Sequence, residues 1–397
     1  MEYTFANRVA GLKPSAIREI LKFTSQPGYI PFSAGNPAPD AFPVDDIARL
    51  SAKLFETHPI DALQYSITEG YGPLRTHLMS YMKEKHNVGR DFDDILITTG
   101  ANQVMELTAK VLCNEGDTVI CENPSFIGSL NAFRSYGVKL RGVEMEADGM
   151  DMNALEQALK EEKRARFIYT IPNFQNPTGV TMSYEKRRQL YALAKKYGVL
   201  ILEDNPYGDT RFAGEDVPCI KSLDEDGLVI YCGSFSKVMA PGMRVGYAIA
   251  PGPVFSKLVV CKQVVDVHTN IWSQIVAHGF MTECDYDGHL KKNQALYGKK
   301  ARYTMDLMDK HLAPYISYQP IEGGLFLWCR LPDGVDMNAF CKEAVNRKVA
   351  TVPGSAFLMD ENEPCQCFRI NYSTPTDQQI AQGMEILGRL AAETCGR

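Results

Sequence analysis

The stretch GSFSKVMAPGMRVGY places a lysine, two serines and an arginine directly after the apolar run LVIYC. Lys237 follows Ser234 and Ser236, and Arg244 comes seven residues later. A lysine that forms a Schiff base must lose its ammonium proton, and burial beside a second cation such as Arg244 favours this loss. Two hydroxyl groups and a guanidinium also suit a phosphate dianion. The segment therefore predicts a Schiff-base lysine beside a phosphate site; a solvated lysine at a strand end is the structural alternative.

Two other apolar runs also end in glycine or polar residues that could contact a ligand. The run DILITTG leads through Gly100 into a helix predicted to begin near Ala101 and Asn102. The unpaired N–H groups of a helix start suit a phosphate, although a glycine there can also be a simple turn residue. The run RFIYTI ends before IPNFQNPTG, where Asn176 precedes a proline, a pair that by itself indicates a turn.

The apolar run VLILEDNPYG ends in a carboxylate and a phenol. Asp204 at the end of a buried strand is costly unless it has a cationic or hydrogen-bonded partner. A protonated ring nitrogen of a cofactor would be such a partner, and Tyr207 could then donate to a ring oxygen. The alternative is that Asp204 opens the turn before Pro206. Ligands of parallel sheets bind beyond the carboxyl ends of the strands, so these positions are candidates for one site.

Residues 94–250 have the pattern of a scaffold that would bring these strand ends together. Short β-branched runs alternate with amphipathic stretches, from DILITTG and ANQVMELTAKVLCNEG to GLVIYCGSFS and RVGYAIAP. This alternation predicts an α/β fold with a mostly parallel sheet covered by helices on both faces. We expect it to form a large domain over residues 41–290.

The pattern changes toward the carboxyl end. Residues 253–311 are predicted to be helical, with a long connecting helix over YGKKARYTMDLMDKHL. YISYQPIEGGLFLWCRLP then indicates a glycine-centred hairpin, followed by a helix, the strand CFRINYS and a terminal helix. These elements predict a smaller α+β domain over residues 291–397. Residues 1–40 are rich in proline and are expected to form an arm with one short helix near residues 15–24, packed with the small domain.

The composition argues against several other classes of protein. A chain of 397 residues with 45% hydrophobic and 23% charged residues is typical of globular proteins. The net charge of −6 is spread without long runs of one sign, so neither nucleic acid nor a membrane is an expected partner. The chain has no apolar stretch of about 18 residues and no signal-type start, which predicts a cytoplasmic location. Eleven scattered cysteines and seven histidines form no disulfide framework and no metal-binding motif, so no metal is expected.

The ordered motifs TGANQ, NPTG, EDNPYG, SFSK with its downstream arginine, and FRINYS resemble those of the class I/II aminotransferases, which have fold type I and depend on pyridoxal 5′-phosphate (PLP). The resemblance covers nearly the whole chain. SAIREILK, GNPAPDAFP and QYSITEGYGPLR make it most similar to the branch of 2-aminoadipate and kynurenine aminotransferases. It implies a large PLP-binding domain, a smaller domain and a homodimer.

The resemblance also implies a role for each matched residue. Lys237 would bind the cofactor covalently and transfer the substrate proton, Asp204 would pair with the pyridine nitrogen, and Tyr207 with Asn176 would hold the ring oxygen. The other implied cofactor contacts are to the phosphate from Ser234, Ser236, Arg244, Ala101 and Asn102, to the ring face from Phe126, and to the phosphate of the neighbouring subunit from Tyr65.

Substrate contacts follow from the same resemblance. Arg369 in FRINYS would clamp the α-carboxylate with its fork of donors, completed by Asn176 and the backbone of Gly35. Arg18 in SAIREILK would reach the side-chain carboxylate of acidic substrates; an exposed helix arginine is the alternative.

Some of these positions depart from the family pattern or have a structural alternative. Ala101 stands where many relatives have serine, which removes one phosphate hydroxyl, and Phe126 stands where tyrosine or tryptophan is common. Phe126 could also be plain core, Tyr65 a packing residue, and Arg369 the partner of a structural carboxylate.

The sequence thus predicts a homodimeric, PLP-dependent aminotransferase that works in two half-reactions, with glutamate and 2-oxoglutarate as one pair and an acidic or aromatic amino acid in the other. A Cβ-lyase of the same fold would use the same lysine, aspartate and arginine. An effector-binding regulator would need a winged helix ahead of GNPAPDAFP. A nicotinamide-dependent dehydrogenase would need a G-x-G-x-x-G motif after a strand, which the chain lacks.

Overall fold

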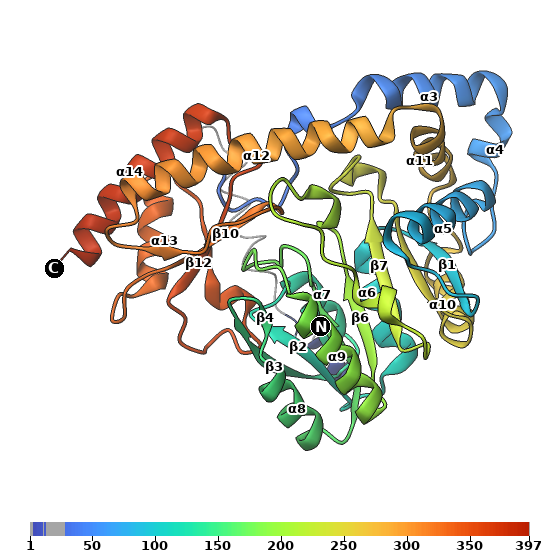
Figure 1. The fold of residues 1–397 in the computed structure, drawn as a ribbon, viewed down its shortest axis with the longest axis horizontal. Helices are drawn as coiled ribbons and strands as arrows, with labels where there is room; N and C mark the ends of the chain where they lie inside the picture. Colours follow the sequence, from blue (N-terminus) through green and yellow to red (C-terminus); the bar gives the residue numbers. More distant parts are fainter. Residues whose placement is uncertain (1–2, 11, 13–27, 397) are drawn as a thin grey trace.

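The computed structural model describes residues 3–10, 12 and 28–396. The helix expected near residues 15–24, and Arg18 with it, lies outside the described residues. Figure 1 shows a large and a small sheet side by side, with one long helix, α12 (Tyr286–His311), running past both.

The large sheet has eight strands in the order β1-β8-β7-β6-β5-β2-β3-β4. Neighbours from β7 through β6, β5 and β2 to β3 are parallel, whereas β8 is antiparallel to both β7 and β1, and β4 is antiparallel to β3. The prediction of a mostly parallel sheet is therefore confirmed. The strands are β1 (Asp93–Thr98), β2 (Thr118–Asn123), β3 (Lys139–Glu146), β4 (Gly149–Met150), β5 (Ala165–Thr170), β6 (Leu200–Asp204), β7 (Val229–Ser234) and β8 (Gly246–Pro251).

Alternate residues of these strands enter different hydrophobic clusters, as the two-residue period of a strand requires. In β5, Phe167 and Tyr169 pack in the cluster that includes α6 (Ala101–Leu112) and α7 (Ile127–Arg134), whereas Ile168 faces α8 (Met152–Glu161) and α9 (Tyr184–Tyr197). Helices thus cover both faces of the sheet. The other helices around it are α3 (Val44–Thr57), α4 (Pro59–Leu63), α5 (Gly72–His86), α10 (Gly252–Asp266) and α11 (Ile271–Glu283).

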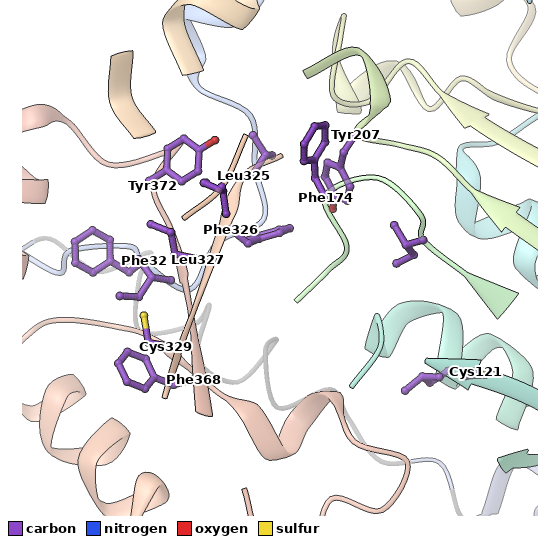
Figure 2. Packing of buried hydrophobic residues seen from close by; sticks show 14 of the residues in the cluster. Phe32, Cys121, Phe174, Tyr207, Leu325, Phe326, Leu327, Cys329, Phe368 and Tyr372 are labelled. Carbon is purple, nitrogen blue, oxygen red and sulfur yellow. The ribbon is translucent and has the colours of Figure 1, made fainter. Parts of the chain in front are cut away.

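The small sheet has four antiparallel strands in the order β11-β12-β10-β9. The predicted hairpin is present, because Tyr318 on β9 pairs with Cys329 on β10. One continuous hydrophobic cluster joins the two sheets, and Figure 2 shows Phe326 of the small sheet near Tyr207 and Phe174. A boundary near residue 290 falls inside α12, and the domain limits stay a prediction. The elements are β9 (Ser317–Tyr318), β10 (Phe326–Arg330), α13 (Met337–Asn346), β11 (Val352–Pro353), β12 (Cys367–Asn371) and α14 (Asp377–Cys395).

Residues 30–32 attach the amino-terminal segment to the small domain. Ile30 forms a parallel bridge with Val349, and the N–H of Asn371 on β12 donates to the carbonyl of Phe32 at 2.7 Å. These contacts bring residues 33–36 to the edge of the candidate site. Short helices complete the fold: α1 (Asn7–Ala10), η1 (Pro39–Ala41), η2 (Gly208–Thr210), η3 (Ile220–Leu223), η4 (Pro241–Met243) and η5 (Gly354–Phe357).

Candidate active site

A cavity of about 300 Å³ lies where the carboxyl ends of β6 and β7 and the start of α6 meet β10 and β12 of the small sheet. Its size is at the lower end of the range for small-molecule sites. Of the residues selected from the sequence that the structure describes, all but Tyr65 line it; Arg18 lies outside the described residues. The selected residues that line it are Gly35, Ala101, Asn102, Phe126, Asn176, Asp204, Tyr207, Ser234, Ser236, Lys237, Arg244 and Arg369.

Lys237 follows β7 and extends into the cavity, where its Nζ donates to the carbonyl of Gly35 at 2.7 Å. Burial, and after it the positive charges of Arg369 and Arg244, lower the pKa of Lys237 from 10.5 to about 8. The sequence indicated Arg244 as the second cation, but Arg369 has the larger effect. A neutral amine, the form that attacks a carbonyl, is therefore accessible near physiological pH.

Asp204 is the last residue of β6 and is 4% exposed. Its Oδ2 accepts a hydrogen bond from the Tyr169 hydroxyl at 2.8 Å, while its Oδ1 is buried and has no hydrogen-bond partner among the described residues. Burial raises the pKa of Asp204 from 3.8 to about 7, and the bond from Tyr169 acts in the opposite direction. The carboxyl does not cap the following turn. A buried oxygen without a donor indicates that a ligand supplies one.

Tyr207 and Asn176 lie together on the side of the cavity toward the small sheet. The ring of Tyr207 packs edge-on against that of Phe326, with centroids 5.8 Å apart. Asn176, which follows β5 and precedes a cis proline, accepts from Nη1 of Arg369 at 2.8 Å through its Oδ1. Asn176 thus connects the large sheet with the arginine of the small sheet.

Arg369 lies on β12 and is 2% exposed. Its guanidinium stacks on Phe326, 4.1 Å from the ring centroid, and its Nη2 donates to the carbonyl of Ser33 at 2.9 Å. No carboxylate of the described residues lies within ion-pair distance of it, so the structural alternative of a carboxylate partner does not occur there. Burial lowers the pKa of Arg369 to about 10, and its Nε has no hydrogen-bond acceptor in the described chain. A buried cation without a charged partner is costly, so this arginine is suited to bind an anionic ligand.

The first turn of α6 lies at another end of the cavity, beside Gly100 and Arg244. Gly100 has φ of +76°, and a Cβ there would lie 2.1 Å from Nη2 of Arg244, so the guanidinium occupies the space that a side chain would need. Arg244 donates to the carbonyls of Thr99 and Pro241, both at 3.2 Å, and forms no ion pair with a described carboxylate. Beside it lie the first two residues of the helix, Ala101 and Asn102, and the pair Ser234 and Ser236, in which the N–H of Ser236 donates to Oγ of Ser234 at 3.1 Å.

Two predicted aromatic residues differ in their position relative to the cavity, and two other aromatic residues were not predicted. Phe126 is partly exposed and lines the cavity, whereas Tyr65 lies outside it, 81% exposed, with its ring edge-on to His268. The sequence did not single out Phe326, which stacks on Arg369, or Tyr169, which bonds Asp204. Both lie inside apolar strand runs, FLWCR and RFIYTI, and a polar hydroxyl within such a run was the available signal for Tyr169.

A family model described as aminotransferase class I and II matches residues 27–387. The chain belongs to this family. The aromatic-amino-acid aminotransferase 1 of Thermococcus litoralis is 36% identical to it, over 99% of this chain and 95% of that protein. The 2-aminoadipate transaminase of Thermus thermophilus is 35% identical, over 97% and 96%. The crystal structure of Pyrococcus horikoshii kynurenine aminotransferase in complex with PMP, at 32% identity, matches 98% of this chain and 97% of that one with a TM-score of 0.94.

The protein is therefore a transferase of amino groups between amino acids and 2-oxo acids, with fold type I and PLP as its cofactor. The cavity of this class I/II aminotransferase fits that cofactor, because Oδ1 of Asp204 lacks a donor and the guanidinium of Arg244, packed against Gly100, has no carboxylate partner in the described chain. When bound, PLP withdraws electrons from the substrate Cα and makes its C–H bond acidic. No helix of residues 3–10, 12 and 28–396 is long and apolar enough to cross a membrane.

Proposed function

We propose that this aminotransferase takes the amino group from an L-amino acid in one half-reaction and gives it to a 2-oxo acid in the next, with glutamate and 2-oxoglutarate as one pair. The observation that carries this proposal is the buried guanidinium of Arg369, which lies in the same cavity as Lys237 and has no carboxylate partner in the described chain. A substrate α-carboxylate would supply the missing anion and accept two parallel hydrogen bonds. Such a clamp fixes the orientation of the Cα–H bond.

Lys237 is the proposed general base. Its lowered pKa lets the amine accept a proton from the substrate Cα and return it at neutral pH. Asp204 is proposed to accept from the protonated ring nitrogen through Oδ1, and Tyr207 with Asn176 to bind the ring oxygen. The phosphate is assigned to Ser234, Ser236, Arg244 and the first N–H groups of α6, at Ala101 and Asn102, and the ring face to Phe126.

Analysis of the products separates this proposal from a Cβ-lyase, and Lys237→Ala tests the role of the lysine. The purified holoenzyme is mixed with a panel of single amino acids while the cofactor absorption band, the 2-oxo acid and ammonia are followed. We expect loss of the band with one equivalent of oxo acid and no ammonia, and no reaction in the variant. Release of ammonia would indicate a Cβ-lyase instead, and a variant that transaminates at the wild-type rate would refute the role of Lys237.

The amino acid partner is proposed to be aromatic or acidic, the classes named in the relatives above. The ring of Phe326 lines the cavity beside Arg369 and suits an aromatic side chain. The described cations of the cavity are Lys237, Arg244 and Arg369, and each has another assignment, so a side-chain carboxylate requires a further cation, for which we propose Arg18. Arg18→Ala should lower kcat/KM for 2-aminoadipate at least about tenfold and leave that for phenylalanine within about twofold. Equal losses for both substrates would contradict this assignment.

We also propose that the enzyme is a homodimer in which Tyr65 reaches the cofactor phosphate of the partner subunit. Exposed apolar residues lie close in sequence to Tyr65 and to His268, whose ring Tyr65 contacts, and such residues are typical of surfaces that associate. They are Ile60, Leu63, Ile67, Val264 and Val267, between 45% and 78% exposed.

Complementation tests the proposed dimer. Tyr65→Ala and Lys237→Ala proteins are refolded together and assayed. If each site combines residues of two chains, a mixed dimer contains one site with both residues intact, and the mixture regains activity up to about one quarter of wild type, given random pairing. A mixture no more active than its parts would contradict the shared site.

A further inference from the structure

The carboxyl of Asp204 lies at the end of a buried chain of hydroxyl groups. Tyr169 on β5 is fully buried, and its hydroxyl donates to Oδ2 of Asp204 at 2.8 Å. Oγ of Ser129 on α7, also fully buried, lies 2.8 Å from the same Tyr169 oxygen. A tyrosine has one hydroxyl proton, which goes to Asp204, so Ser129 is the donor in the second bond. The order of donation is therefore Ser129 to Tyr169 to Asp204.

Two other polar groups lie near this carboxyl. The thiol of Cys232 on β7 also lowers the pKa of Asp204, but less than Tyr169 does, and its Sγ lies 4.0 Å from the backbone carbonyl of Ala101. Glu122 on β2, fully buried, accepts from the hydroxyl of Thr170, the N–H of Ile171 and the amide of Gln175. Tyr169 is thus the hydroxyl donor to Asp204 among the described residues.

We propose that Tyr169, supported by Ser129, is a positioning residue that binds one oxygen of Asp204 and so keeps the carboxyl ionised with its other oxygen free for the ring nitrogen of PLP. This inference rests on the proposed function, which assigns Asp204 to that nitrogen. The proton between the ring nitrogen and Oδ1 has two possible sites. A hydrogen bond to Oδ2 stabilises the carboxylate and keeps the proton on the ring, where it promotes electron withdrawal.

Burial opposes this arrangement. It raises the pKa of Asp204 to about 7, whereas the bond from Tyr169 lowers it. Without the tyrosine hydroxyl, we expect the shared proton to move toward Asp204 and the ring to become neutral. Ser129 strengthens the effect, because a hydroxyl that accepts a hydrogen bond becomes a better donor.

The test compares Tyr169→Phe with a matched control, Tyr231→Phe. Tyr231 is also buried, on β7, but its hydroxyl accepts from the amide of Asn205 at 2.9 Å and is not bonded to Asp204. Each holoenzyme is loaded with PLP labelled with ¹⁵N in the ring, and the ring-nitrogen chemical shift is recorded by NMR without substrate. The dissociation constant of PLP and kcat are measured on the same samples.

In Tyr169→Phe, the ¹⁵N signal should move toward that of neutral pyridine and kcat should fall about ten- to a hundredfold, the range for a hydrogen bond to a charged group. The PLP dissociation constant should change less than about fivefold, and Tyr231→Phe should match wild type in all three measurements. A wild-type ¹⁵N shift in Tyr169→Phe, or a kcat within twofold, would overturn the inference.

A second variant covers the possibility that Tyr169→Phe does not fold. Ser129→Ala removes only the hydrogen bond between Ser129 and Tyr169, and should move the ¹⁵N signal in the same direction by a smaller amount. An unmoved signal would show that Ser129 does not support Tyr169. The NMR readout needs no substrate, so a wild-type enzyme that forms no oxo acid would refute the proposed function and not the role of Tyr169.

Discussion

Replacing Lys237 by methionine should stabilise the cofactor-free protein at neutral pH. Methionine keeps an unbranched side chain in the cavity and removes the ammonium group. Because burial, Arg369 and Arg244 lower the pKa of Lys237 to about 8, the folded protein binds this proton more weakly than the unfolded chain does. At pH 7 the proton is present in both states, so the wild-type lysine destabilises the fold.

The magnitude follows from the fall of the pKa from 10.5 to about 8. At about 1.4 kcal/mol for each pH unit, the penalty reaches about 3 kcal/mol at pH values well below 8. Lys237 lines a cavity that water can enter, which weakens the effect of burial, so we expect about 2 kcal/mol. The penalty is complete below pH 8, decreases between pH 8 and 10.5, and is absent above 10.5, where the amine is neutral in both states.

Urea unfolding of the cofactor-free wild type and of Lys237→Met at pH 7 and pH 10 measures this contribution. The stability difference between the two proteins should shrink by about 1.5 kcal/mol between pH 7 and pH 10, which is about three quarters of the penalty, whereas any constant part reflects the packing of methionine. Lys257→Met, at an exposed position of α10, is the matched control; a change with pH as large as that of Lys237→Met would show that the effect does not come from the cavity. A pH-independent difference for Lys237→Met would refute the reasoning.

Two further predictions concern the two ends of the cavity. Arg369→Lys should lower kcat/KM about a hundredfold at nearly unchanged PLP affinity, because lysine offers a point charge where arginine offers a fork of donors; steady-state kinetics and cofactor titration together check this. Gly100→Ala should weaken PLP binding at least about tenfold by displacing Arg244, as measured by titrating the cofactor-free protein. Gly198→Ala, also at positive φ but with no atom within 4 Å of the added Cβ, should leave PLP affinity unchanged and so separates backbone strain from the collision.

The mostly parallel sheet and the position of the site were predictable because both depend on local patterns. Each apolar run ends at the residue that begins a polar motif, and a parallel sheet brings such ends together, which is why Asp204 and Lys237 could be placed in one site from their motifs. The start of α6 at Ala101 was predictable for the same reason. The amino-terminal helix and Arg18 lie outside the described residues, and that prediction is not tested.

Contacts between the two sheets were not predictable from these patterns. The bond from Lys237 to the carbonyl of Gly35 joins residues 202 positions apart, and the effect of Arg369 on the pKa of Lys237 depends on how the small sheet packs against the large one. Tyr169 was missed because a tyrosine within an apolar strand is normally interpreted as a core residue. Its role depends on β6, the neighbour of β5, which carries Asp204. The spacing of motifs along the chain does not indicate which residues of the small sheet pack against the large sheet, or which strand lies beside another.

The charges of the cavity explain why these residues form a binding site and not a structural network. Lys237, Arg244 and Arg369 all line it, and none forms an ion pair with a carboxylate of the described chain. Cations gathered without anions are costly in a folded protein, and the carboxylate that does face the cavity, Asp204, leaves one oxygen without a donor. A ligand that brings a phosphate, a carboxylate and a protonated ring nitrogen would satisfy all of these groups at once. Loaded PLP together with an amino acid substrate has that set of charges, so binding and chemical competence are properties of the same unpaired residues.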